Sequence, residues 1–191
     1  IKARVLESHI GGTLISINQR ECWMKLIGDF NVYNVSAVYG AAIELGMTAD
    51  EALQGISNLN PINGRFQKIE GPKGITGIID YAHTPDALKK ILSSLQKFRK
   101  PPQRIITIIG CGGDRDKGKR PEMASIASRL SDYVILTSDN PRSESPEAIL
   151  RDMECGLKKP DMKYCMSIVD RSQGIRLACQ NANPNDIILL A

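Results

Sequence analysis

The chain has 191 residues, which is enough for one or two domains with a buried core. Hydrophobic residues make up 42% of the sequence and charged residues 24%, an ordinary globular composition that favours neither a membrane-spanning nor a disordered chain. The net charge is only +4, aromatic residues are few, and no basic run is longer than a pair such as Lys158-Lys159, so nucleic-acid binding is not expected. Anionic small molecules remain suitable partners.

The cysteines and the chain ends give two further expectations. The five cysteines include no Cys-x-x-Cys pair and no secretory signal is present, so we expect reduced thiols in a cytoplasmic protein. The chain begins at Ile1 without a methionine and stops at Ala191, directly after the apolar run 187–190. We therefore expect it to be part of a longer protein.

The N-terminal residues contain three short β-rich runs, at 3–8, 11–18 and 22–27. Glycines and polar residues separate these runs, so together they predict a small antiparallel meander. We expect Ile15 and Trp23 to belong to its core rather than to contact a ligand.

Helical spacing of the apolar residues begins after this meander. Asn31 is placed to cap a first helix, and Gly46 is placed to end it. Thr48 and Glu51 form a capping box, which predicts the start of a second helix.

The next stretch, 58–74, is rich in Asn, Gly and Pro and has little periodicity. We place the boundary between two domains there, 1–62 and 63–191. After it, strands are expected at 75–79, 105–109, 134–137, 164–169 and 187–190, and helices at 85–98, 121–131, 146–158 and 171–182. This alternation predicts an α/β fold of Rossmann-like type, with a mostly parallel sheet and helices on both faces.

Open sheets of this type bind ligands beyond the carboxyl ends of their strands. Four polar loops are expected there, and they begin with Asp80, Gly110, Asp139 and Asp170. Two of the following helices carry clear start signals, because Thr84-Pro85 and Ser145-Pro146 each supply a hydroxyl cap before a proline.

The most distinctive stretch is 104–121, where an apolar strand runs into three glycines and a cluster of charges. Gly110, Gly112 and Gly113 carry no Cβ, so their backbone N–H groups could approach an anion closely. Pro121 suits the first position of the following helix.

The same loop has the spacing of a phosphate-binding loop, from Gly113 to Lys119. However, Arg120 stands where a Ser or Thr would hold magnesium, and the carboxylates of Asp114 and Asp116 would repel a triphosphate. A loop with both signs of charge suits a zwitterionic ligand better.

The loops at 80–85 and 138–144 carry the other candidate ligand residues. Asp80 and His83 could meet a ribose hydroxyl or a phosphate, or they could only satisfy loop and cap hydrogen bonds. In 138–144, an acid (Asp139), an amide and a guanidinium stand together and could hold the ammonium and carboxylate groups of an amino acid, although a surface proline turn would look the same.

Five segments, in this order along the chain, resemble the C-terminal part of the Mur ligases, the ATP-dependent enzymes of bacterial cell-wall synthesis. They are residues 28–34, 63–66, 80–88, 110–121 and 139–142. The resemblance implies that 1–62 is the end of the family's central ATP-binding domain, with short antiparallel strands and two helices. It implies that 63–191 is the amino-acid-binding domain, truncated at its end.

The resemblance also implies the nucleotide contacts. Four residues match positions that approach ATP in the family: Asn31, Arg65, Asp80 and His83. The phosphate-binding loop and the magnesium ligands of the family lie upstream of this chain, so ATP and Mg²⁺ are implied as cofactors but no metal ligand and no catalytic residue is assigned here. Cys111, Lys117 and Lys119 are interpreted as structural support for the glycine loop.

Four further residues match the family's site for the incoming amino acid, meso-diaminopimelate: Arg115, Asp139, Asn140 and Arg142. Arg142 would take the carboxylate at the far end of that molecule, which lysine lacks. The implied activity is an amide ligase that adds meso-diaminopimelate to the UDP-muramoyl dipeptide, UDP-N-acetylmuramoyl-L-alanyl-D-glutamate, through an acyl phosphate. A Gly-Lys-Gly-His-Glu segment, which contacts the amino acid in the family, would follow Ala191 and is not in the chain.

Three alternatives stay open. The chain could belong to a lysine-adding ligase of the same family, or it could be a non-catalytic module that binds an amino acid or a nucleotide. A dinucleotide-binding oxidoreductase domain is a weaker alternative, because the glycines that begin at Gly110 lack the G-x-G-x-x-G spacing. The implied partners are small-molecule substrates, with no nucleic acid and no membrane.

Overall fold

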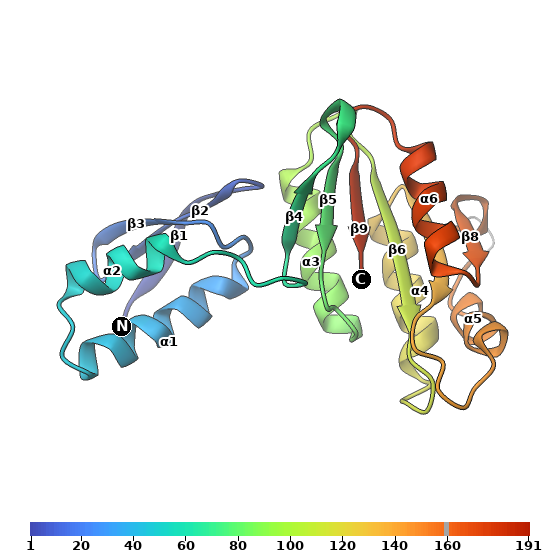
Figure 1. Ribbon diagram of the computed structural model, residues 1–191, viewed down its shortest axis with the longest axis horizontal. Helices are drawn as coiled ribbons and strands as arrows, with labels where there is room; N and C mark the ends of the chain where they lie inside the picture. Colours follow the sequence, from blue (N-terminus) through green and yellow to red (C-terminus); the bar gives the residue numbers. More distant parts are fainter. Residues whose placement is uncertain (159–160) are drawn as a thin grey trace. The chain divides into compact units, whose positions relative to one another are not determined.

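The computed structural model describes residues 1–158 and 161–191 and forms two compact units, Ile1–Phe66 and Gln67–Ala191 (Figure 1). The division falls between Phe66 and Gln67, a few residues after the boundary expected from the sequence. Each unit has its own sheet and its own hydrophobic core.

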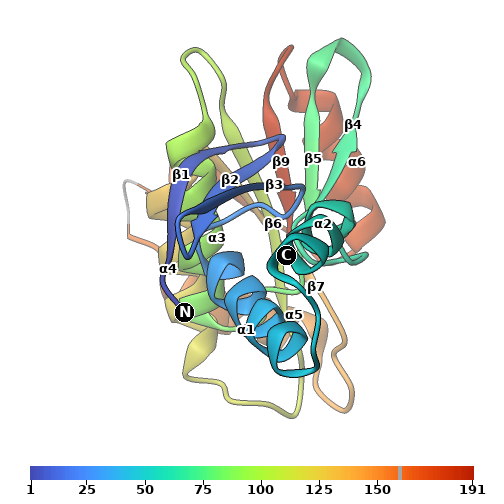
Figure 2. The same cartoon turned by 90° about the vertical axis from the view of Figure 1, so that its left-hand side faces the viewer.

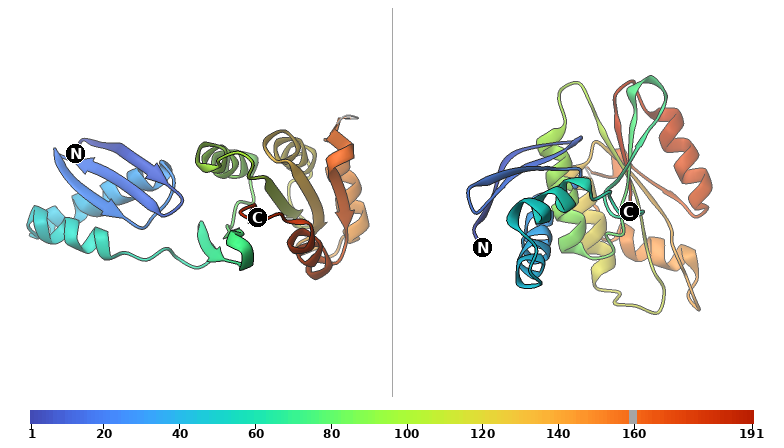
Figure 3. Two further views of the ribbon diagram at one scale, coloured as in Figure 1. Left: turned by 90° about the horizontal axis from the view of Figure 1, so that it is seen from above. Right: turned by 60° about the vertical axis from the view of Figure 1, so that its left-hand side comes forward.

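In the first unit, a three-stranded antiparallel sheet of order β1-β2-β3 is followed by two helices. The elements are β1 (Ala3–His9), β2 (Gly12–Ile17), β3 (Arg20–Met24), α1 (Phe30–Glu44) and α2 (Ala49–Asn58). Both helices lie on the same face of the sheet (Figure 2; Figure 3). The core is formed where Ile15 and Ile17 of β2 pack with Val35 and Tyr39 of α1 and with Ile56 of α2.

Two details of this unit differ from the sequence-based expectations. Trp23 is not a core residue: it is 37% exposed, and its ring lies 5.0 Å from the ring of His9. The reason is strand alternation, since Cys22 and Met24 on either side of it are buried and Trp23 therefore faces the opposite way. The first helix begins at Phe30, so Asn31 lies inside it instead of capping it.

In the second unit, the described residues form a six-stranded sheet of order β4-β5-β9-β6-β7-β8. The strands are β4 (Gln67–Glu70), β5 (Thr76–Ile79), β6 (Ile105–Cys111), β7 (Tyr133–Ser138), β8 (Cys165–Ile168) and β9 (Ile187–Leu190). Only the edge strand β4 is antiparallel to its neighbour, and the other pairs are parallel. The predicted α/β fold with a mostly parallel sheet is therefore confirmed.

Helices cover both faces of this sheet (Figure 3). They are α3 (Pro85–Phe98), α4 (Lys119–Leu130), α5 (Pro146–Glu154) and α6 (Arg171–Asn181), with short 3₁₀ turns η1 (Pro72–Gly74) and η2 (Asp161–Tyr164). Helices α3, α4 and α5 lie side by side on one face, whereas α6 covers the other. This arrangement follows from the connections, because right-handed crossovers place a helix on opposite faces when the direction of strand addition reverses after β8.

The last strand, β9, lies between β5 and β6 and completes the core. Its residues Ile187, Ile188 and Leu189 are almost fully buried, because β5 and β6 flank the strand and helices cover both faces of the sheet. On the α6 side, Ile106, Ile135 and Ile188 pack against Ala178. This strand order brings the end of β9 beside the end of β5, where Asp80 N donates to Leu190 O at 3.0 Å.

Three features of this unit differ clearly from the sequence-based expectations. Strand β4 was not expected, because Gln67–Glu70 is mostly polar and only half-buried, as suits an edge strand. Helix α4 begins at Lys119, so Pro121 occupies its third position instead of its first. Helix α5 ends at Glu154, four residues before the expected end at 158.

Candidate functional site

The candidate site lies in the second unit, where two long loops follow neighbouring parallel strands. One loop connects β6 to α4, and the other connects β7 to α5. Because the carboxyl ends of parallel strands share one edge of a sheet, the two loops lie against each other. The contacts between the two loops fix the positions of the charged side chains that both loops carry.

The glycines of the β6–α4 loop permit this close contact. A Cβ on Gly113 would lie 1.8 Å from the carbonyl oxygen of Pro141, and a Cβ on Gly110 would lie 2.7 Å from the carbonyl oxygen of Thr137. The N–H group of Gly113 donates to Asn140 O at 2.8 Å. At this position, the expectation of a backbone N–H directed at an anion is therefore wrong, because the partner loop already accepts its hydrogen bond.

In addition, each of the two loops carries a carboxylate that accepts hydrogen bonds from the other loop. Asp114 accepts hydrogen bonds from Ser143, at 2.6 Å from Oγ and 3.2 Å from the backbone N. In return, Glu144 accepts from the backbone N of Asp114 at 2.7 Å. The Ser143 bonds are the largest cause that holds the pKa of the Asp114 carboxyl below its usual value. Each loop thus stabilises the other through a charge-assisted bond.

Arg120, the second residue of α4, is fully buried and binds Glu144 in a bidentate manner. Its Nη2 donates to Oε1 of Glu144 at 2.8 Å, and its Nη1 donates to Oε2 at 2.9 Å and to Asp152 Oδ2 at 2.8 Å. The bonds to Glu144 are the largest cause that raises the pKa of the Arg120 guanidinium. The same bonds are the largest cause that lowers the pKa of Glu144, to about 2. The residue that stands in place of the Ser or Thr of a phosphate-binding loop is therefore buried in an ion-pair network and is not presented to a ligand.

Three of the four residues expected at an amino-acid site meet around Gly112. A Cβ on this glycine would lie 2.9 Å from Nη1 of Arg142, 3.6 Å from the carbonyl oxygen of Asn140 and 3.8 Å from Cγ of Arg115. The fourth, Asp139, packs over Gly110, with its Cβ 3.0 Å from the position of a Cβ there. All four side chains belong to exposed residues.

This group has the chemistry needed to bind an amino acid. Arg142 donates from Nη1 to Gly113 O at 2.7 Å, which fixes the guanidinium and leaves its other N–H groups for a carboxylate. Asp139 supplies a carboxylate that can accept from an ammonium group. Arg142 itself adopts a left-handed backbone conformation with φ 49°, and Asp114 does the same with φ 52°. Such strain is maintained only where surrounding contacts fix the backbone, and here the two loops supply them.

Arg171, at the start of α6, is a charged neighbour that the sequence did not suggest. Its Nη2 donates to Ala191 O at 3.2 Å, and its Nη1 is buried without a hydrogen-bond partner among the described residues. Burial lowers the pKa of this guanidinium, and the nearby carboxylate of Asp139 acts in the opposite direction. Arg171 therefore adds a positive charge beside Asp139. The Asp-Arg pair that starts α6 was the available sequence signal.

The loop after β5 holds the other two candidates of this unit. His83 places Nδ1 3.0 Å from Tyr81 O, and its ring centroid lies 4.9 Å from that of Tyr81 with the two rings tilted by 53°. The carbonyl oxygen of His83 accepts from Lys119 Nζ at 2.8 Å. Thr84 caps α3, as expected, by accepting from Ala87 N at 3.3 Å. Lys119 thus joins this loop to the start of α4, consistent with its interpreted supporting role.

The remaining candidates, Asn31 and Arg65, belong to the first unit. Asn31 donates from Nδ2 to Ile27 O at 2.8 Å and accepts from Asn34 Nδ2 at 3.2 Å, so its side chain fastens the first turn of α1. Arg65 is exposed near the end of the unit. The structure therefore brings Arg115, Asp139, Asn140 and Arg142 together within one unit, and it divides the ATP candidates between the two units.

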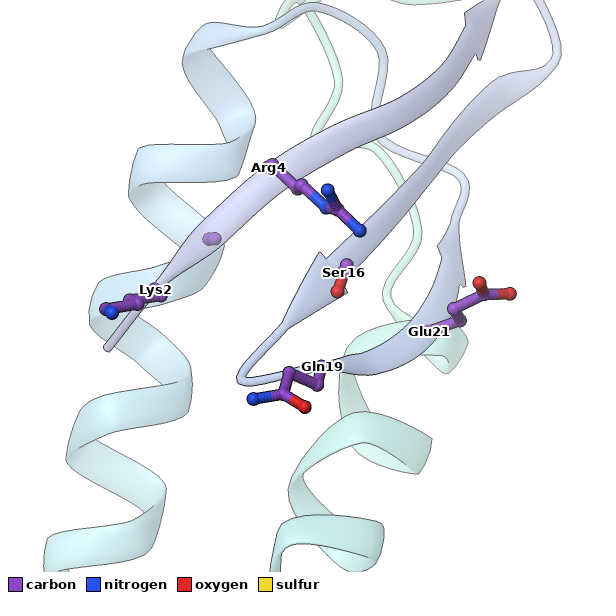
Figure 4. A pocket seen from close by; sticks show the side chains of 6 residues that line it. Lys2, Arg4, Ser16, Gln19 and Glu21 are labelled. Carbon is purple, nitrogen blue, oxygen red and sulfur yellow. The ribbon is translucent and has the colours of Figure 1, made fainter.

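The first unit also has a hollow, on the sheet face away from α1 and α2 (Figure 4). Lys2, Arg4, Ser16, Gln19 and Glu21 line it. Arg4, Ser16 and Glu21 are cross-strand neighbours in the sheet, so the hollow is the polar outer face expected from strand alternation. None of the candidate ligand residues lies in it.

The described residues lack two further features. Residues 1–158 and 161–191 contain no cluster of three or more His, Cys, Asp or Glu side chains that could hold a metal ion. Within the same residues, no helix has the length and apolar character needed to cross a membrane.

By fold, the second unit is an α/β domain with a mostly parallel sheet, and its charged loops extend beyond the carboxyl ends of two neighbouring strands. The chain belongs to the Mur ligase family, since the family model described as "Mur ligase, glutamate ligase domain" matches residues 64–191.

Relatives with known names agree with this family. The chain is 49% identical to the UDP-N-acetylmuramoyl-L-alanyl-D-glutamate–2,6-diaminopimelate ligase of Bacteroides thetaiotaomicron over 190 residues, covering 100% of this chain and 39% of that protein. It is 50% identical to the protein of the same name from Parabacteroides distasonis, with the same coverage. The chain thus spans about two fifths of the length of these curated relatives.

Solved structures extend the comparison. A structure of a UDP-N-acetylmuramoyl-L-alanyl-D-glutamate–2,6-diaminopimelate ligase has a TM-score of 0.65 and 33% identity, and the match covers 98% of this chain and 38% of that one. The UDP-N-acetylmuramate-alanine ligase of Thermotoga maritima matches with a TM-score of 0.73 at 19% identity, covering 98% of this chain and 41% of that one, and it supports the fold alone.

Proposed function

We propose that this chain is the amino-acid-binding part, and a portion of the ATP-binding part, of an ATP-dependent ligase that adds meso-diaminopimelate to UDP-N-acetylmuramoyl-L-alanyl-D-glutamate. The observation that carries the proposal is the meeting of Arg115, Asn140 and Arg142 around Gly112, with Asp139 alongside. Membership of the Mur ligase family and the names of relatives about 50% identical support the same reaction.

In the proposed reaction, ATP phosphorylates the side-chain carboxylate of the D-glutamate residue and releases ADP. The amine of meso-diaminopimelate then attacks the acyl phosphate, the tetrahedral intermediate expels phosphate, and an amide bond remains. Mg²⁺, held by residues upstream of this chain, would neutralise phosphate charge. Arg65 in the first unit would add a cationic group near the phosphates.

The residues of the second unit would place the amine. Arg142 would grip the carboxylate at the far end of meso-diaminopimelate, and Asp139 would hold an ammonium group. Such placement converts a bimolecular attack into a nearly intramolecular one. This conversion can remove a large share of the activation barrier. Asp80 and His83 would approach the ribose and adenine of ATP, so both substrates would contact loops at one edge of the same sheet.

The choice of amino acid follows from charge. Lysine lacks the second carboxylate of meso-diaminopimelate, so it would leave the Arg142 guanidinium without its anionic partner. A lysine-adding ligase is therefore the second candidate, and the non-catalytic binding module is the third. A cytoplasmic location and small-molecule partners belong to the same proposal, because nucleotide-linked precursors and ATP are its substrates.

Phosphate release by the full-length protein tests the proposal. The protein is incubated with ATP, Mg²⁺ and the UDP-muramoyl dipeptide, and meso-diaminopimelate, L-lysine or no amino acid is added. Release that depends on meso-diaminopimelate is the expected result. Release that depends on lysine alone would retain the family but overturn the substrate, and no release with either amino acid would favour the binding module.

A further inference from the structure

The buried ion pair between Arg120 and Glu144 stands apart from the residues expected to touch substrate. Arg120 has a fully buried side chain, whereas the Glu144 side chain is 16% exposed and the Asp152 side chain 44% exposed. A buried cation is costly unless it is paired and hydrogen-bonded. Here the guanidinium has three acceptors, Glu144, Asp152 and Gly112 O, the last at 3.3 Å.

These acceptors come from different parts of the unit. Gly112 belongs to the β6–α4 loop, Glu144 lies near the end of the loop after β7, and Asp152 lies in the last turn of α5. The bonds to Gly112 and Glu144 therefore connect the two loops, whereas the bond to Asp152 connects only α4 to α5. Removal of the Glu144 carboxylate would therefore break a connection between the two loops, whereas removal of the Asp152 carboxylate would break only a connection between α4 and α5.

Glu144 transmits this constraint to the neighbouring loop. While both of its oxygens accept from Arg120, Oε1 also accepts from the backbone N of Asp114 at 2.7 Å, and Lys117 Nζ lies 3.3 Å from Oε2. Asp114 precedes Arg115 in the chain, and Glu144 follows Arg142 by two residues. One carboxylate thus fixes the backbone next to both arginines of the proposed amino-acid site.

We propose that Arg120 and Glu144 form a positioning pair that sets the distance and orientation between Arg115 and Arg142, and thereby the selectivity for an amino acid with two carboxylates. In this arrangement the pair would act through the loops and not by touching the substrate. This inference rests on the proposed function, because it assigns a selectivity role to the geometry of that same site. The two left-handed residues, Asp114 and Arg142, are where loss of the pair would let the loops relax.

The test compares two isosteric variants of the full-length protein, each of which neutralises one of the two carboxylates bound to the Arg120 guanidinium. Glu144→Gln should raise the KM for meso-diaminopimelate roughly tenfold or more, as expected for weakened charge-assisted bonds, while the KM for ATP stays within about twofold. Asp152→Asn, the matched control, should leave both KM values within about twofold, because the bond between Asp152 and Arg120 joins α4 to α5 and does not join the two loops. A milder variant, Ser143→Ala, removes the 2.6 Å bond to Asp114 at an exposed position and should raise the same KM by roughly threefold.

The outcomes separate this inference from the proposed function. If Glu144→Gln and Asp152→Asn both lower the melting temperature but leave the KM for meso-diaminopimelate unchanged, the pair is only structural and the inference is overturned. An equal rise in the KM for ATP and for meso-diaminopimelate would overturn it too. If the wild-type protein shows no release that depends on meso-diaminopimelate, the proposed function fails before the variants are compared.

Discussion

The carboxylate of Glu144 accepts a hydrogen bond from the backbone N of Asp114 at 2.7 Å, which joins the loops that follow β6 and β7. The same carboxylate is bound by both terminal nitrogens of Arg120. Because Glu144 is ionised in all of these contacts, its protonation would weaken them together. The pair of loops is therefore sensitive to acid at this residue.

Stability at low pH tests this relationship. The folded protein lowers the pKa of Glu144 from its ordinary value of 4.5 to about 2, chiefly through Arg120. The unfolded chain therefore binds more protons than the folded one between these values, so the stabilisation is complete above pH 4.5 and is lost as pH falls towards 2. Urea unfolding at a series of pH values should show this decline, and Glu144→Gln should flatten it.

The control for the pH experiment is Glu122→Gln, which removes an exposed carboxylate from the first turn of α4. It should retain the decline of the wild-type protein. An equal flattening in both variants would mean that general charge, rather than the Arg120–Glu144 pair, causes the acid sensitivity.

Gly113→Ala should disrupt the contact between the two loops. The new Cβ would lie 1.8 Å from the carbonyl oxygen of Pro141, and the clashing atoms are backbone atoms of Pro141, which cannot move aside as a flexible side chain could. We expect a loss of about 1–3 kcal/mol in the free energy of unfolding, typical of overpacking. Gly118→Ala is the matched control, because its Cβ would meet only the side-chain Oδ1 of Asp116, at 3.2 Å. Denaturant titrations that rank the two variants equally would contradict this account.

Local signals in the sequence predicted much of the second unit. Thr84 and Ser145 each cap a helix with proline at its start, because a hydroxyl, a proline and an acid within four residues fix the first turn independently of the rest of the chain. The apolar strands were likewise visible as uninterrupted runs. The order of the strands was not visible in the sequence, because β9 pairs with β5, more than a hundred residues earlier in the chain, and also with β6, far away in sequence.

The candidate site shows the same division. Arg115, Asp139, Asn140 and Arg142 could be proposed from residue type and family resemblance, because charged loops at strand ends are a recurrent pattern. The role of the three glycines in the close contact between the loops could not be predicted. The atoms that exclude a Cβ at Gly113 belong to a loop almost thirty residues further along the chain.

The burial of Arg120 could have been predicted from the helical periodicity of α4. It shares the buried stripe of α4 with Met123, Ala124 and Ala127, at spacings of three, four and seven residues. A charged residue on such a stripe must find a partner inside the protein. The partner itself, Glu144, could be identified only from the fold.

Thiol labelling should distinguish the buried from the exposed cysteines. Burial raises the pKa of Cys111 to about 11, so about one thiol in a thousand is ionised at pH 8, and its sulfur packs against Met123. Burial also raises the pKa of Cys22. Iodoacetamide should therefore modify Cys155 and Cys179, both exposed, well before these two, as followed by mass spectrometry. Rapid labelling of Cys111 would show that the β6–α4 loop opens in solution.

Asp80→Ala should affect ATP and spare the amino acid. The backbone N–H group of Asp80 donates to Leu190 O at 3.0 Å, and this bond is available to alanine as well as to aspartate. We expect the KM for ATP to rise roughly tenfold, as for one charged hydrogen bond, with the KM for meso-diaminopimelate unchanged. Steady-state phosphate release by the full-length protein measures both. A selective rise in the KM for meso-diaminopimelate would mean that this loop serves the amino acid.

Arg142→Ala should have the opposite selectivity. The guanidinium is held by one bond to Gly113 O and presents its remaining donors to solvent, where the far carboxylate of meso-diaminopimelate would bind. Losing that contact should cost about 2–5 kcal/mol in kcat/KM for meso-diaminopimelate, at least about thirtyfold, while the KM for ATP stays constant. Arg142→Lys keeps the charge but not the bidentate geometry, so it should recover only part of the loss. Kinetics for meso-diaminopimelate that are unchanged in Arg142→Ala would refute the assignment, and equal losses for ATP and the amino acid would indicate that the variant disturbs the fold of both loops.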